Sequence, residues 1–161
     1  MKKVKEILNH IFIDGLSGMA LGLFATLIVG TIITQAGSLI GGIAGHYLVI
    51  FGKLAQALTG AGIGVGVAYK YKESPLVTIS AAVAGLVGAF ASKIIAGTVL
   101  ADGVITLAGP GEPLGAFIAA FVAVTCGHII SGKTKIDILI TPVTTILTGS
   151  IVGIIVGPPI S

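Results

Sequence analysis

The chain has 161 residues, of which 55% are hydrophobic and only 9% are charged, and its mean hydropathy is +1.12. A soluble domain needs about a quarter of its residues charged to cover its surface, so this composition excludes a soluble globular protein. The formal net charge is +3, but its lysines stand near the ends of apolar segments and do not alternate with aromatic residues. The sequence therefore predicts an integral membrane protein with a lipid bilayer around it and no nucleic-acid partner.

Residues 1–14 predict an amphipathic helix that lies on the membrane surface. Apolar side chains recur there at helical spacing, between charged ones: Val4, Ile7, Leu8 and Ile11 beside Lys2, Lys3, Lys5 and Glu6. The apolar stretch that follows is too long for a secretory signal peptide and lacks a convincing cleavage site. We therefore treat it as part of the mature chain.

About five apolar segments follow, and a helix that crosses a bilayer needs roughly 20 such residues. We place these spans at about 16–33, 43–68, 76–95, 114–130 and 138–156. A polar link at 34–38 separates the first two spans. The second is interrupted by glycines and is one long or broken span, or alternatively two passes. The predicted fold class is an all-α, polytopic transmembrane protein, with residues 15–161 as its membrane domain.

Lysine placement predicts the orientation, because cytoplasmic loops retain positive charge. With five spans and a cytoplasmic N-terminus, all the lysines outside the spans fall on the inner side: Lys2, Lys3, Lys5, Lys70, Lys72, Lys133 and Lys135. This distribution predicts a multi-pass protein of the inner (plasma) membrane. Glycines spaced four residues apart in several spans predict tight helix packing in addition.

The sharpest functional signal is the stretch 106–116, Thr-Leu-Ala-Gly-Pro-Gly-Glu-Pro-Leu-Gly-Ala. Its prolines and glycines cannot continue a helix, and non-helical backbone at membrane depth requires protein or a water-filled cavity around it. We therefore predict a re-entrant loop at 101–113 that carries Glu112, flanked by Gly111 and Pro113. An acid inside the membrane is typical of a binding site or pathway. Alternatively, Glu112 caps the next helix, where the helix dipole favours a carboxylate.

A second set of polar residues falls in the second span. His46, Lys53 and Gln56 lie within about 80° of one another on a helical wheel. They form a wall of a hydrophilic pathway, or else Lys53 snorkels to an interface and His46 sits in an outer link. Lys93 would neutralise Glu112 or Asp102 if the loop at 101–113 folds back beside the third span.

The other sequence patterns give weaker evidence for a function. Residues 127–134, Gly-His-Ile-Ile-Ser-Gly-Lys-Thr, fit the phosphate-binding loop letter for letter, but the strand and soluble α/β context that such a loop needs is missing. No His, Cys and Asp cluster has metal-ligand spacing, and no serine, histidine and acid set is evident. The sequence thus predicts no metal, no cofactor and no self-contained catalytic site. The single cysteine, Cys126, allows no disulfide framework.

Several segments resemble a known family: residues 109–117 (Gly-Pro-Gly-Glu-Pro-Leu-Gly-Ala-Phe), 131–138, Thr141-Pro142 and 156–161. They are similar to the IIC-like membrane proteins of the bacterial phosphotransferase system, and more narrowly to the branch often labelled as toxin regulators. The similarity runs over essentially the whole chain. Because members of the family are longer, the resemblance implies that this chain is an N-terminal half.

The resemblance implies a permease subunit of a phosphoenolpyruvate-dependent sugar phosphotransferase system. Such a subunit binds a sugar or related polar solute in the membrane and presents it to cytoplasmic phosphotransferase subunits, so it is at most the membrane part of an enzyme. In this family a Gly-x-x-Glu-Pro signature lies near a re-entrant loop, and Gly109 to Pro113 has that form. Glu112 would then hydrogen-bond the solute. We further expect the chain to associate with copies of itself, as a homo-oligomer, or with a second half of the permease. The alternative is a membrane-embedded sensor or regulator that binds a small molecule without transport.

Overall fold

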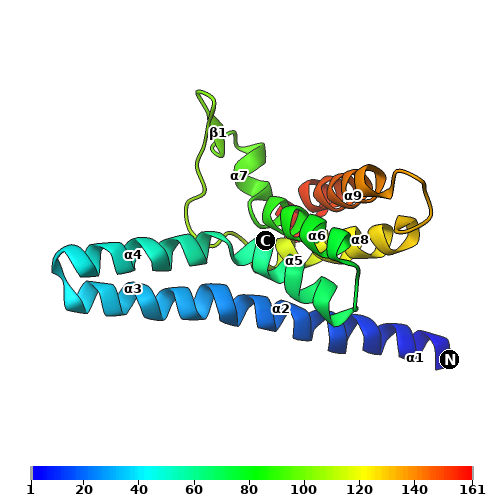
Figure 1. Ribbon diagram of the computed structural model, residues 1–161, viewed down its shortest axis with the longest axis horizontal. Coiled ribbons are helices and arrows are strands. Elements are labelled where there is room, and N and C mark those ends of the chain that lie inside the picture. Colours follow the sequence, from blue (N-terminus) through cyan, green and yellow to red (C-terminus); the bar gives the residue numbers. More distant parts are fainter. Residues whose placement is uncertain (1, 161) are drawn as a thin grey trace.

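The computed structural model describes residues 2–160, and the side chains of all of these except 10–12 and 160. Most of the described chain is helical: α1 (Lys2–Asn9), α2 (Leu16–Leu23), α3 (Val29–Ile40), α4 (Gly42–Ala57), α5 (Thr59–Lys70), α6 (Pro75–Ala89), α7 (Ala91–Ile95), α8 (Pro113–Ile130) and α9 (Asp137–Ile160). Strands β1 (Leu100–Ala101) and β2 (Val104–Ile105) form a small antiparallel hairpin between α7 and α8 (Figure 1). The predicted all-α, polytopic membrane fold is confirmed.

The first helix is continuous over 39 residues, from Lys2 to Ile40. The π-helical turns His10–Gly15 and Phe24–Ile28 join α1, α2 and α3 without a break. At 1.5 Å per residue this helix is about 58 Å long, well beyond the roughly 30 Å of a hydrocarbon core. The amphipathic segment and the first span thus share one helix, and the surface position expected for residues 1–14 stays a prediction.

Residues 34–38 are helical, which differs from the polar link expected there. Their hydroxyls are satisfied inside the helix, because Thr34 Oγ1 donates to Gly30 O at 2.9 Å and Ser38 Oγ donates to Thr34 O at 3.1 Å. The chain reverses instead at Gly41 and Gly42, whose φ angles of +67° and +66° favour glycine.

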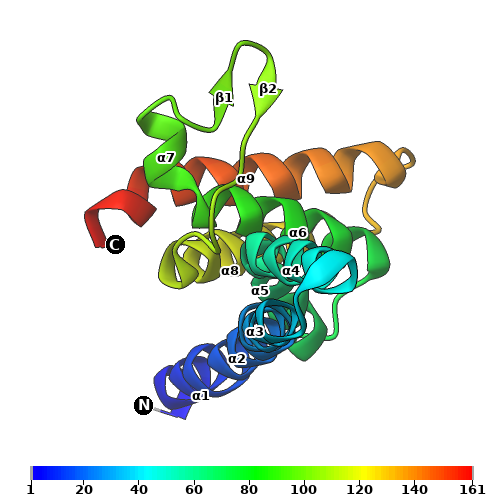
Figure 2. The ribbon, with the colours of Figure 1, turned by 90° about the vertical axis from the view of Figure 1, so that its left-hand side faces the viewer.

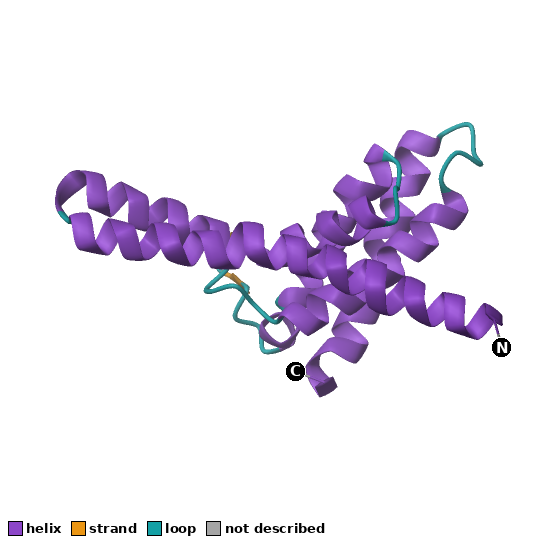
Figure 3. Cartoon of the chain, turned by 90° about the horizontal axis from the view of Figure 1, so that it is seen from below, coloured by secondary structure: helices purple, strands orange, loops and turns teal. Residues whose placement is uncertain are grey.

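After this turn, α4 runs back along α3 as an antiparallel helical hairpin, which we call the arm. It extends beyond the rest of the molecule (Figures 1 and 3). Apolar side chains on it are open to their surroundings: Leu39 is 88% exposed and Ile43 is 81% exposed.

Helices α2, α5, α6, α8 and α9 pack together as a bundle that holds the buried core. Glycine allows the close approach: a Cβ atom on Gly60 would lie 2.7 Å from the carbonyl oxygen of Gly85, and one on Gly115 would lie 2.6 Å from that of Gly88. The prediction of tight helix packing is confirmed. The largest fully buried apolar side chains are Phe90, Ile63, Val67, Val77 and Val124.

Helices α4 and α5 meet at a bend of 53° at Leu58, within the segment predicted as the second span. By length and composition, three described helices can cross a membrane, or four if this bent pair is one span. Helix α6 is apolar but shorter than these, and the five spans placed from the sequence stay a prediction.

One end of the bundle gathers the segments that carry most of the lysines. The N-terminus of α1, the connection from α5 to α6 and the connection from α8 to α9 all lie at this end in Figure 1. The two connections touch, because Ser74 Oγ lies 3.3 Å from Ser131 Oγ and His128 Nδ1 lies 3.0 Å from Glu73 Oε1. We call this the lysine-rich end. That it faces the cytoplasm stays a prediction.

Candidate functional site

The candidate site lies at the opposite end of the bundle, where several helices break. Helix α6 ends at Ala89, α7 begins after Phe90, and α8 begins at Pro113. The backbone N–H of Glu112 donates to the carbonyl oxygen of Ala89 at 2.8 Å, which fixes the returning chain to the end of α6. Figure 2 shows the chain between β2 and α8 passing down to this point from the projecting hairpin.

Gly111 and Pro113 shape the backbone on either side of Glu112. Gly111 has φ +75°, and a Cβ atom there would lie 2.6 Å from the carbonyl oxygen of Ala89, so both conformation and space require glycine. Pro113 occupies the first turn of α8, where a missing N–H costs no helical hydrogen bond.

The carboxylate of Glu112 is only half satisfied. Ser92 Oγ donates to Glu112 Oε1 at 3.3 Å. Glu112 Oε2 is buried and accepts no hydrogen bond from any residue that the structure describes. Although Glu112 occupies the N-cap position of α8, its side chain makes no capping hydrogen bond. The carboxylate therefore offers a buried acceptor that the helix does not use.

Lys93 holds the loop at 101–113 through a backbone contact, and not by neutralising Glu112 or Asp102 as the sequence suggested. Its Nζ donates to the carbonyl oxygen of Ala108 at 2.6 Å and lies 5.4 Å from the centre of the Phe90 ring. Among the described residues it forms no ion pair with Glu112 or Asp102. The loop does fold back onto α7, and the lysine binds backbone there. Whether residues 101–113 enter the bilayer stays a prediction.

Comparison with known families gives a match over most of the chain. Residues 13–161 match the family model described as "Phosphotransferase system, EIIC". This chain belongs to that family. The match includes the whole bundle, the arm and the Glu112 loop, and it identifies a permease-type membrane subunit of the phosphotransferase system. The comparisons with curated proteins and with solved structures gave no match.

In this EIIC chain the other predicted site residues lie on the arm. His46 is close to the tip and packs edge-on against Tyr47, and Lys53 is exposed. Gln56, near the bend, donates to Thr31 Oγ1 at 3.3 Å. Among the described residues no hydrogen bond or ion pair joins this set to Glu112. Their role as a wall of a pathway stays a prediction.

Sequence reasoning missed Ser92, the side chain that holds Glu112. It lies 20 residues before Glu112 and within an apolar segment, where a serine is commonly satisfied by its own helix. The only available signal was its position beside Lys93, which was already singled out.

The EIIC chain carries a second buried carboxylate, at the lysine-rich end, and this one is paired. The side chain of Glu73 is 7% exposed, and it faces the largely exposed His128 at 3.0 Å. Beside it, burial and then the negative charge of Asp14 raise the pKa of Tyr71 to about 12.

Proposed function

We propose that this chain binds a sugar or a related polar solute at Glu112 and moves it across the membrane for phosphorylation by soluble phosphotransferase subunits. The single observation that carries the proposal is Glu112 Oε2, a buried carboxylate oxygen that accepts no hydrogen bond from the described residues. Leaving a buried charged acceptor unpaired costs more than the 1–3 kcal/mol of a neutral one. A ligand with hydroxyl donors would remove that cost.

A carboxylate suits a polyhydroxyl ligand for a chemical reason. Its oxygens only accept hydrogen bonds, while each sugar hydroxyl can donate one. Each such charge-assisted bond contributes about 1.5–3 kcal/mol in a site shielded from water. The surrounding breaks in the helices support the same role, since transporters form solute sites where helices are discontinuous.

The orientation and partners belong to the same proposal. The lysines gathered with the N-terminus at one end support a cytoplasmic position for that end and insertion in the plasma membrane. The phosphoryl group, derived from phosphoenolpyruvate, would then be delivered by soluble partner subunits on that side. The arm extends beyond the bundle (Figure 1), with Leu39 and Ile43 exposed, so lipid, a second copy or a second half of the permease would lie against it.

The test is thermal unfolding of the purified chain, followed by circular dichroism, with a panel of sugars, sugar acids and polyols. A ligand at 100 times its Kd adds about 2.7 kcal/mol to the folded state, and each kcal/mol raises Tm by roughly 2–4 °C at this size. We expect at least one compound to raise Tm, and Glu112→Gln to abolish that rise.

Asp102→Asn is the matched control. It removes the same charge from the exposed hairpin of the same loop, and asparagine tolerates the φ of +53° found there. In Asp102→Asn the ligand must still raise Tm as it does in the wild-type chain. A rise in Tm that survives in Glu112→Gln would refute the site. Binding without uptake, in vesicles that contain the soluble subunits and phosphoenolpyruvate, would refute transport.

A further inference from the structure

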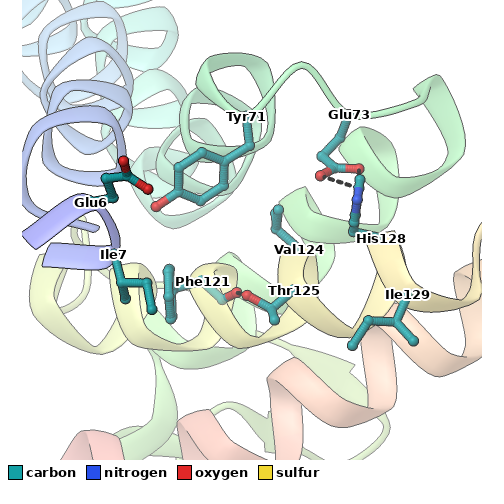
Figure 4. A pocket seen from close by; sticks show the side chains of 9 residues that line it. All are labelled: Glu6, Ile7, Tyr71, Glu73, Phe121, Val124, Thr125, His128 and Ile129. Atoms are coloured by element: carbon teal, nitrogen blue, oxygen red, sulfur yellow. Dashed lines mark hydrogen bonds and ion pairs between the residues drawn. The ribbon is translucent and has the colours of Figure 1, made fainter. Parts of the chain in front are cut away.

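A cavity of about 650 Å³ lies at the lysine-rich end, and Glu112 is not among its lining residues (Figure 4). It is formed by α1, by the connection after α5 and by the second half of α8. Its volume falls within the range of about 300–1,000 Å³ found for small-molecule sites. The inference drawn from it is independent of the function proposed for Glu112.

One wall of this cavity is apolar. Ile7 comes from α1, while Phe121, Val124 and Ile129 come from α8. The ring of Phe121 packs edge-on against that of Tyr71, with centroids 6.2 Å apart, so the aromatic pair holds the wall together. A short alkyl chain would find dispersion contacts along this surface.

Two of the polar residues that line the cavity, Glu6 and Glu73, are acidic, and the others are Tyr71, Thr125 and His128. Glu6 lies beside the ring of Tyr71, and Glu73 lies across the opening against His128 (Figure 4). Among the described residues that line the cavity, none is lysine or arginine. The side chain of Glu73 is only 7% exposed and is held against His128 Nδ1 at 3.0 Å, so a bound cation would share this carboxylate with His128.

The aromatic pair of Tyr71 and Phe121 also favours a positively charged ligand. The faces of tyrosine and phenylalanine rings attract ammonium groups within about 6 Å. Carboxylates and aromatic rings around an apolar wall are thus complementary to a cation on a hydrocarbon chain. A neutral hydroxyl head on the same chain would donate a hydrogen bond to Glu6 or Glu73 without the attraction between opposite charges, and an anionic head would be repelled.

We propose that this cavity binds an amphipathic ammonium compound, with its alkyl chain along Phe121 and Val124 and its ammonium group at Glu73. The same chemistry occurs in two sources. One is the ethanolamine head of an aminophospholipid, and the other is a soluble alkylamine. The position of the cavity beside the amphipathic helix α1 makes both accessible.

The experiment compares three probes with the same hexyl chain: hexyltrimethylammonium, hexanoate and hexanol. Each is titrated onto the full chain in nanodiscs of pure phosphatidylglycerol, whose heads carry no ammonium, and Tm is measured by circular dichroism. We expect the cation to raise Tm more than hexanol does, and hexanoate not to raise it. In Glu73→Gln the apparent affinity for the cation should fall about tenfold, the factor that corresponds to about 1.4 kcal/mol.

Asp102→Asn, at the other end of the molecule, must keep the wild-type affinity. Should Glu73→Gln fail to fold, Glu6→Gln on the exposed helix α1 replaces it and is expected to weaken the cation in the same direction. Equal effects of all three probes, or full affinity in the folded glutamate variants, would overturn the proposal.

A second arm separates the two sources. The chain is extracted from bilayers of phosphatidylethanolamine and phosphatidylglycerol, and the retained lipid is identified by native mass spectrometry. Enrichment of phosphatidylethanolamine that Glu73→Gln abolishes would identify the lipid head as the ligand. A cation effect on Tm without that enrichment would identify a soluble amine. Absence of both effects overturns the proposal.

Discussion

The two ends of the bundle each bury a carboxylate, and they treat it differently. At the lysine-rich end, short connections bring His128 onto Glu73 at 3.0 Å. At the other end, breaks at Leu58 and Phe90 and the loop before α8 leave Glu112 with one weak hydrogen bond from Ser92 and one buried oxygen without a partner. The Glu73 carboxylate already has a partner within the chain, so a ligand there would share it with His128. One oxygen of Glu112, by contrast, has no partner among the described residues and is open to a hydroxyl donor.

The largest expected effect comes from crowding the loop at the Glu112 end. Gly111→Ala forces a side chain into φ +75° and against the carbonyl oxygen of Ala89. The backbone term alone costs about 1–2 kcal/mol, and the contact with Ala89 adds to it. We therefore expect a fall in Tm at least twice that of the control.

The control, Gly109→Ala, has a similar φ of +78° but nothing within 4 Å of the new Cβ atom, so only the backbone term applies. Both Tm values are measured by thermal unfolding of the purified variants. Equal falls in Tm for the two variants would contradict the contact between this loop and the end of α6.

The two carboxylates themselves provide the next comparison. Without ligand, Glu73→Gln removes a charge that is paired, and we expect it to lower stability by about 1 kcal/mol. Glu112→Gln removes a charge that is poorly satisfied, so stability should be unchanged or slightly higher, as is common for binding residues. Chemical denaturation of both variants measures the difference. An equal loss in Glu112→Gln would indicate that this residue is structural.

The smallest effect concerns Tyr71 at the lysine-rich end. Because its pKa is about 12 in the folded chain against 10.0 ordinarily, the unfolded chain loses the phenolic proton first as pH rises. The stability that Tyr71 contributes is complete below pH 10 and is lost as pH approaches 12. Tyr71→Phe should therefore lose less Tm over this interval than wild type. Tyr47→Phe, exposed on the arm, should behave as wild type does.

Much of the bundle could be predicted from the sequence because its signals are local. Apolar runs predicted long apolar helices, and glycines spaced four residues apart indicated the close contacts. The proline and glycine content around Glu112 predicted a non-helical loop there. The arm could not be predicted in this way. Thr34 and Ser38 read as a polar link, but hydroxyls that bond to their own helix need no loop.

The partner of Glu112 escaped prediction for a different reason. Ser92 reaches the carboxylate because the chain breaks at Phe90, and no proline marks that break. Lys93 was singled out by its charge, yet it binds the carbonyl oxygen of Ala108 and no acid among the described residues. Such choices among nearby acceptors depend on tertiary geometry and not on local sequence.

The most direct test of the account is an infrared difference spectrum of the purified chain with and without the solute found by thermal unfolding. If Glu112 Oε2 accepts a hydrogen bond from the bound solute, the carboxylate stretching bands should shift on binding. The shift should persist in Asp102→Asn and vanish in Glu112→Gln. A carboxylate shift that is unchanged in Glu112→Gln would contradict the assignment of the solute to this residue.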